Sequence, residues 1–91
     1  SLVFKGQNYK LTPDMKAMLA TVASKMKANP YGNIEILAYP GGHIKQNVFT
    51  RRLELIKAYL VDQQGISQNR INMRNEDGGG DIQTIDIKPT Y

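Results

Sequence analysis

The sequence predicts one α+β domain, a two-layer α/β sandwich with the element order β-α-β-α-β-β, in which two helices pack on one face of a mixed four-stranded sheet. Two observations lead to this class. Two segments carry apolar residues at helical spacing, and segments typical of strands precede and follow each of them. The last two strand-like segments are joined by a loop too short for a third helix, and 91 residues suffice for one modest core.

The first half of the chain predicts a short strand and a helix. Residues 2–4 are an apolar run that is consistent with an opening strand. Thr12 is suited to cap a helix, Pro13 fits its first position, and Asp14 favours the positive end of the helix dipole. The helix is expected to stop at Asn29, because the residue before a proline is pushed out of the α region. Its apolar stripe consists of Met15, Leu19, Val22 and Met26, flanked by Met18 and Ala23.

Residues 34–39 predict a central strand of the sheet, since apolar side chains occupy most of both of its faces. The strand runs into Pro40, Gly41 and Gly42. A loop at the carboxyl end of a central strand, just before a helix N-terminus, is where α/β sheets usually place ligands. The two glycines either allow the backbone to approach a ligand closely or only turn the chain.

A second helix is expected from about Gln46 to Gln64. It places Arg51 on the wet side and Arg52 at the flank of the buried stripe, near Tyr59. From there Arg52 is expected to reach the loop that leaves the central strand, either as a structural clamp on loop carbonyls or as a grip on a ligand. The buried stripe itself is formed by Phe49, Leu53, Ile56 and Leu60.

The end of the chain predicts two strands, over residues 70–74 and 82–88, the second ending at Pro89. A polar, glycine-rich loop joins them. Its run of three glycines, 78–80, lacks the following Lys and Ser or Thr of a phosphate-binding P-loop. The apolar side chains expected to share a face are Ile71 with Met73 in the first strand and Ile85 with Ile87 in the second.

The composition of the chain limits the kinds of partner that are expected. Twelve Lys and Arg against eight Asp and Glu give a net charge of +4, but the basic residues are dispersed and form no run with interleaved aromatics, so no nucleic acid is expected. No apolar run approaches the roughly 20 residues of a transmembrane helix, so membrane contact is expected only through a tether of the parent protein. Without cysteine there is neither a disulfide nor a thiolate metal site.

An enzyme is not expected. His43 is the only histidine, and in a polar loop without a positioned partner it is more often a solvated side chain than a general base. No Ser-His-Asp order, paired-carboxylate spacing or metal-ligand cluster is visible. The sequence therefore predicts no catalytic residue, no metal site and no cofactor.

The order of several short motifs resembles the OmpA-like domain of envelope anchoring proteins. The resemblance covers nearly the whole chain, and the ending at residues 86–89 is similar to a divergent branch of that family. It implies a single domain over residues 1–91, excised from a longer envelope protein of the periplasm that is associated with the outer membrane. The motifs are Leu11-Thr12-Pro13, Asn29-Pro30, Ala38-Tyr39, Arg51-Arg52, Tyr59-Leu60, and Gly65-Ile66 followed by Arg70-Ile71.

In that family the domain binds peptidoglycan through the diaminopimelate of the stem peptide. The second arginine of the pair takes a ligand carboxylate, and this role corresponds to Arg52. An aspartate after the central strand takes the ligand's ammonium, but its position here holds Gly41, and no acid lies between that strand and Arg52. The loop is also about four residues shorter than usual, which leaves Lys45 or Asn47 as the nearest counterpart of the family's asparagine.

Because the aspartate is missing, two functions are expected from the sequence. An amine held beside Arg52 without an anion would lose a charge-assisted bond and meet a like charge, at a cost on the order of 2–5 kcal/mol. One expectation is a non-catalytic cell-envelope domain that associates with peptidoglycan or anchors its parent protein in the envelope. The alternative is a degenerate OmpA-like scaffold that has lost diaminopimelate binding and contacts envelope proteins. The expected ligand-binding residues, suited to an anion such as a carboxylate, are Arg52, Gly41, Gly42, Tyr39 and Asn47.

Overall fold

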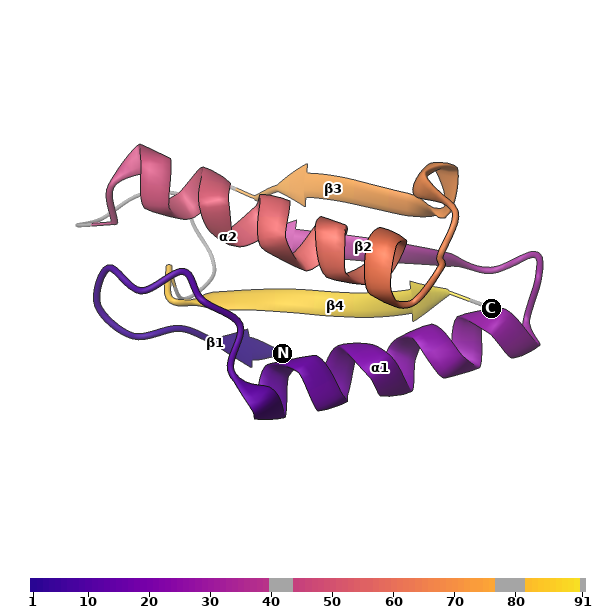
Figure 1. Cartoon of the computed structure of the whole chain (residues 1–91). Helices are drawn as coiled ribbons and strands as arrows, with labels where there is room; N and C mark the ends of the chain where they lie inside the picture. Colours follow the sequence, from indigo (N-terminus) through magenta and orange to yellow (C-terminus); the bar gives the residue numbers. More distant parts are fainter. Residues whose placement is uncertain (40–43, 77–81, 91) are drawn as a thin grey trace.

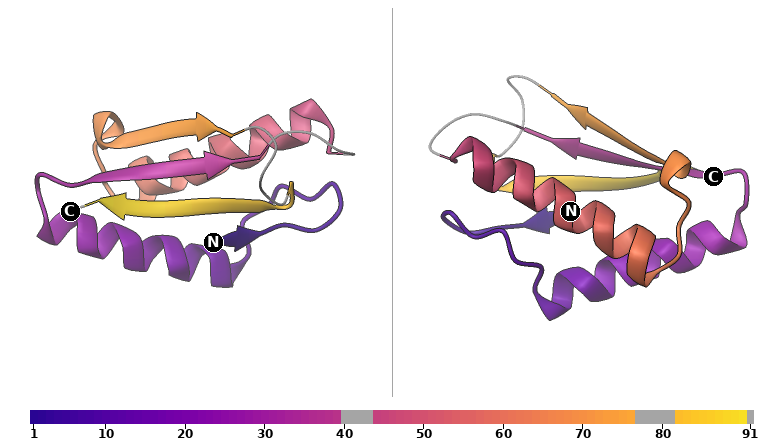
Figure 2. Two further views of the ribbon diagram at one scale, coloured as in Figure 1. Left: turned by 180° about the vertical axis from the view of Figure 1, so that it is seen from behind. Right: turned by 45° about the horizontal axis from the view of Figure 1, so that its top comes forward.

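The computed structural model describes residues 1–39, 44–76 and 82–90. Helices α1 (Pro13–Ala28) and α2 (Gln46–Ala58) lie on the same face of a four-stranded sheet, and the view from behind shows the other face uncovered by helices (Figures 1 and 2). The predicted two-layer architecture and element order are confirmed. The strands are β1 (Leu2–Val3), β2 (Asn33–Ala38), β3 (Ile71–Asn75) and β4 (Thr84–Thr90).

The sheet has the strand order β1-β4-β2-β3 and is mixed, as predicted. The last strand, β4, is inserted between β1 and β2 and runs antiparallel to both of them. β2 and β3 are parallel neighbours, joined through α2. β2 is thus an inner strand, and its last residue, Ala38, is in register with Asn75 on one side and with Ile85 on the other.

Helix α1 begins where its capping signals predict. The backbone N–H of Met15 donates to Oγ1 of Thr12 at 3.2 Å. The buried face differs from the predicted stripe in one member: Ala23 is fully buried, whereas Val22 packs against the core only in part. The buried residues of α1 are Met15, Leu19, Ala23 and Met26.

Arg70 holds the turn after α1. It ends a short 3₁₀ turn (Gln68–Arg70) that precedes β3. Its Nε donates to the carbonyl of Gly32 at 2.9 Å, and its Nη2 donates to the carbonyls of Met26 at 2.9 Å and Asn29 at 2.6 Å. The end of a helix leaves such carbonyls without an intrahelical partner. One side chain therefore terminates α1 and fixes the start of β2.

The last strand lies two residues later than predicted: β4 begins at Thr84 and continues through Pro89 to Thr90. The N–H of Phe4 donates to the carbonyl of Gln83 at 2.8 Å, so in this antiparallel strand the main-chain groups of odd-numbered residues point toward the edge that carries β1. β1 is too short to reach Pro89. The missing N–H of Pro89 therefore removes no ladder hydrogen bond, and an unpaired edge tolerates proline.

The helical segment that starts with α2 continues as a π-helix (Tyr59–Gln63), so its predicted length is nearly correct. Three of the four residues of its predicted buried stripe are buried, namely Phe49, Ile56 and Leu60. Leu53, predicted in the stripe, is only partly buried, whereas Arg52 is buried. The edge strand β3 also leaves Met73 exposed, although Ile71 faces the core. None of the described helices is both long and apolar enough to cross a membrane. The core between the two layers includes Leu2, Phe4, Leu19, Met26, Ile34, Ile36, Phe49, Ile56, Leu60, Ile66 and Ile85.

Candidate functional site

Arg52, the residue on which the predicted ligand site depends, points into the interior of the domain. Only 1% of it is exposed. Nε donates to the carbonyl of Asn8 at 2.6 Å, and Nη2 donates to the carbonyl of Gly6 at 3.0 Å and to Oε1 of Gln83 at 3.1 Å. These partners belong to the connection between β1 and α1 and to the residue before β4. The predicted partner, the loop that leaves β2, falls largely on residues 40–43, outside the described part of the chain.

The charge of Arg52 has an unusual environment. Its Cζ lies 4.6 Å from the centroid of the Phe4 ring, which is itself buried. Such contacts between a guanidinium and an aromatic face are attractive. Burial lowers the pKa of Arg52 from its ordinary value, although a guanidinium keeps its proton inside proteins. Among the described residues no carboxylate forms an ion pair with it, so carbonyl dipoles and a ring face balance the charge.

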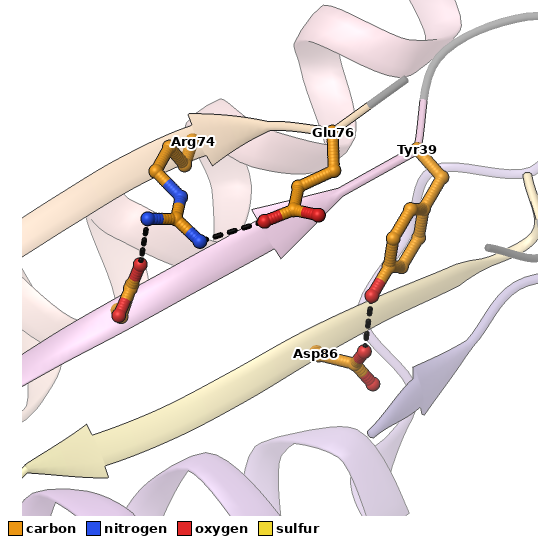
Figure 3. A network of polar contacts seen from close by, with 5 residues as sticks. Tyr39, Arg74, Glu76 and Asp86 are labelled. Atoms are coloured by element: carbon orange, nitrogen blue, oxygen red, sulfur yellow. Dashed lines mark hydrogen bonds and ion pairs between the residues drawn. The ribbon is translucent and has the colours of Figure 1, made fainter. Parts of the chain in front are cut away.

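Tyr39 lies on the opposite side of the sheet from Arg52. Side chains alternate along β2, and Ile36 and Ala38 face the helices, so Tyr39 faces the uncovered side. There its hydroxyl donates to Oδ2 of Asp86 on β4 at 2.7 Å (Figure 3). The structure therefore does not bring Tyr39 and Arg52 together.

The pair formed by Tyr39 and Asp86 shifts both pKa values. Hydrogen bonds from the hydroxyl of Ser1 and then from Tyr39 hold the pKa of Asp86 below its ordinary value. The hydrogen bond to Asp86 raises the pKa of Tyr39, and burial and the negative charges of Asp86 and Glu76 raise it further. The carboxylate of Asp86 is thus kept charged and the phenol of Tyr39 neutral, so these shifts do not favour proton transfer by either group at neutral pH.

Of the remaining predicted site residues, Asn47 is the one in the described part of the chain. Asn47 is exposed in the first turn of α2. Before it, the main-chain N–H of Lys45 donates to Oε1 of Gln7 at 3.1 Å, which ties the start of α2 to the connection after β1. Gly41 and Gly42 lie outside the described residues.

The uncovered face of the sheet carries a second polar network that the sequence did not reveal. Arg74 on β3 contacts Glu35 at 3.2 Å and Glu76 at 2.6 Å (Figure 3). Leu37, between Arg74 and Asp86 in register, is only 4% exposed even though no helix covers this side (Figure 2). In the described part of the chain no cluster of three or more His, Asp or Glu is placed to hold a metal ion.

A groove beside β1 was also not predicted. It has a volume of about 630 Å³ and lies between β1, the connection that follows it and the first turns of α1. The available sequence signals were Val3, which alternates with the buried Leu2 and Phe4, and Met18, at the flank of the α1 stripe. Neither signal by itself distinguishes a groove from a scattered exposed apolar residue.

Comparisons with known proteins identify a neighbour in fold. No protein-family model matches the chain, and no curated protein resembles it closely in sequence. Among solved structures, the OmpA-like domain of FopA1 from Francisella tularensis subsp. tularensis SCHU S4 matches with a TM-score of 0.70 and 13% identity, over 97% of this chain and 69% of that chain. A likeness at this identity concerns the fold and not the ligand. The chain therefore has the fold of an OmpA-like domain.

Proposed function

We propose that this chain is a non-catalytic cell-envelope domain that anchors its parent protein through contacts with other envelope proteins, and that Arg52 acts as an internal clamp rather than as a ligand residue. The observation that carries this proposal is the environment of Arg52. The side chain is 1% exposed, and three protein oxygens accept hydrogen bonds from Nε and Nη2. A ligand carboxylate that took over these donors would break hydrogen bonds worth about 1.5–3 kcal/mol each.

Two further features support an anchoring role in the envelope. The chain shares its fold with the OmpA-like domain of FopA1, and its motifs follow the order found in OmpA-like domains generally. The periplasm, on the side of the outer membrane, is the compartment that this likeness favours. Nε and Nη2 of Arg52 and the hydroxyl of Tyr39 form internal hydrogen bonds, which favours binding of a partner over catalysis.

Binding of a peptidoglycan stem peptide is the second candidate, and one observation favours it. Nη1 of Arg52 forms no hydrogen bond to a described residue, and no described carboxylate neutralises the guanidinium. A carboxylate of diaminopimelate would supply both the acceptor and the charge. The absence of an acid between Pro40 and Arg52 leaves the ligand's ammonium without its usual partner.

Co-sedimentation with purified peptidoglycan sacculi at low salt distinguishes the two candidates. The variants are Arg52→Met, which removes the donors but keeps a long side chain over Phe4, and Arg51→Met, which removes the same charge from the exposed neighbouring residue. Thermal denaturation first establishes that both variants are folded. Under our proposal the wild-type domain and both variants pellet to the same small extent, and free diaminopimelate does not compete.

The opposite pattern would overturn the proposal. It consists of saturable pelleting of the wild-type domain that folded Arg52→Met loses, that Arg51→Met retains, and that free diaminopimelate displaces. Arg51→Met controls for non-specific attraction of a basic protein to an anionic polymer, because both variants lower the net charge by one.

A further inference from the structure

The edge strand β1 borders an open groove. On one side β1 pairs with β4. The groove of about 630 Å³ is lined by β1 and by the first turns of α1. Residues of the connection from β1 to α1 also line it. A sheet edge that faces a helix across a groove is a geometry in which proteins bind extended peptides as an added strand.

Two apolar side chains on the walls of this groove are exposed to solvent. Val3 on β1 is 57% exposed and Met18 on α1 is 41% exposed, whereas Met15, also on the wall, is buried. Met18 borders the groove from the helix side, and Val3 borders it from the face of β1 that points away from the helices. Exposed apolar residues that gather in one groove indicate a surface meant to be covered, unlike single exposed residues elsewhere.

The backbone of β1 offers hydrogen-bonding groups to the groove. The N–H of Phe4 donates to Gln83 on the β4 side, so alternation along the strand turns the N–H and C=O of Val3 toward the other side. Neither group has a partner element there in the described part of the chain. The carbonyl of Lys5, which points the same way, is already used by the N–H of Asn8 at 3.0 Å. Val3 therefore presents the donor and acceptor that an added strand would use.

The charges on the groove favour an acidic occupant. Lys5 and Lys10 line it, and Asp14 is the one carboxylate among the described lining residues. Lys5 follows Val3 by two residues, so its side chain leaves the strand on the same face as that of Val3, away from the helices. An added strand would thus meet apolar Met15 and Met18 on its helix side and Lys5 on its other side.

We propose that the groove binds an extended segment of a protein partner, in which apolar residues alternate with acidic ones, and that this segment adds to β1 as a strand. The proposal rests on the proposed function, since it names the surface through which the domain contacts envelope proteins. Its apolar side chains lie toward Met15 and Met18, its carboxylates lie toward Lys5, and its backbone pairs with Val3.

The opposite edge of the sheet provides a matched control. Met73 on β3 is 39% exposed, close to the exposure of Met18. That edge carries Arg74 with its ion pairs to Glu35 and Glu76, and charged side chains on an edge strand disfavour strand addition. Met18→Glu and Met73→Glu thus make the same change, at similar exposure, on the proposed groove and away from it.

The test is an NMR titration of the ¹⁵N-labelled domain with a blocked octapeptide that alternates Val and Glu. We expect shift changes at the amides of Val3, Lys5 and Met18, with slower hydrogen exchange at the Val3 N–H. Met18→Glu should raise the Kd at least about tenfold, and Met73→Glu should leave it within about twofold. A peptide that alternates Val and Lys should bind at least about tenfold more weakly.

Three results would overturn the groove: no shift at Val3 and Met18 at millimolar peptide, an equal response to the Val-Lys peptide, or equal losses in the two glutamate variants. Different results would refute the proposed peptide site and the proposed function. Missing peptide shifts together with no pelleting on sacculi overturn the groove and leave protein anchoring in place. Pelleting on sacculi that is lost in Arg52→Met would overturn the proposed function. NMR shift changes confined to the groove in the same preparation would still support the peptide site.

Discussion

The guanidinium of Arg52 lies over the ring of Phe4, 4.6 Å from its centroid, and joins α2 to the end of the opening strand. We expect Arg52→Met to lower the free energy of unfolding by about 2–4 kcal/mol, because three part-buried hydrogen bonds from a charged donor are lost. Urea denaturation at neutral pH measures the change. Arg51→Met is the control, and its exposed ion pair with Glu54 at 3.3 Å predicts a loss below about 0.5 kcal/mol. Equal losses in the two variants would contradict an internal role for Arg52.

Arg70 offers an independent test of the same kind of clamp. Arg70→Ala removes donors from the carbonyls of Met26, Asn29 and Gly32, and we expect a loss of about 2–3 kcal/mol in the free energy of unfolding. Amide hydrogen exchange should accelerate most in the last turn of α1 and the first residues of β2. Arg74→Ala, which removes only exposed ion pairs, is expected to cost less than about 1 kcal/mol. Exchange that accelerates uniformly over the chain would argue against a local clamp.

Gly32 and Gly65 are required for different physical reasons, and substitutions can separate them. A Cβ on Gly32 would stand 2.6 Å from the carbonyl oxygen of Thr90, so Gly32→Ala is expected to cost about 1–3 kcal/mol by forcing the end of β4 away. Gly65 has a φ of +71° and open space around it, so Gly65→Ala should cost about 1 kcal/mol through backbone strain alone. Asparagine tolerates positive φ and should restore stability at 65 but not at 32. Thermal denaturation of the four variants measures this, and rescue by asparagine at both positions would refute the contact at Gly32.

The pairing of Asp86 with hydroxyl groups predicts part of the acid sensitivity of the domain. Hydrogen bonds from Ser1 and Tyr39 keep the pKa of Asp86 below its ordinary 3.8. A carboxyl whose pKa is lower in the folded state stabilises the fold above its unfolded pKa, and this contribution is lost as the pH falls through the folded pKa. Asp86→Asn should therefore lose less stability than the wild type between about pH 5 and about pH 2, as measured by urea midpoints. Tyr39→Phe should fall between the two, and identical acid limbs for all three would contradict the pairing.

Local signals were sufficient to predict much of the fold. Thr12 and Pro13 start α1 through contacts within one turn, and the alternation of residues 34–39 reports burial on both faces of β2. Such signals depend on residues that are close in sequence, so they can be recognised without the structure. Pro89 shows where they mislead: a proline usually ends a strand, but here it lies on an edge that β1 is too short to pair.

The site could not be predicted in the same way, because its contacts are not local. The helical period placed Arg52 beside the buried stripe but could not tell that Leu53 would be less buried. The oxygens that accept from Arg52 belong to residues 44, 46 and 31 positions away, and their location follows from the insertion of β4 between β1 and β2. Likewise, Tyr39 is among the ligand-binding residues expected from the sequence, whereas in the structure its hydroxyl donates to Asp86 on the uncovered side of the sheet.

The reach of Arg52 across the sequence has a consequence for folding kinetics. Contacts between distant residues close long loops, whose entropic cost grows with loop length, so they tend to form after the turns of the helices. We expect the bonds from Arg52 to Asn8, Gly6 and Gln83 to be largely absent from the transition state for folding. Stopped-flow measurements on Arg52→Met should then show faster unfolding with a nearly unchanged refolding rate. Arg52 would thereby set how long the domain stays folded, and hardly how fast it folds.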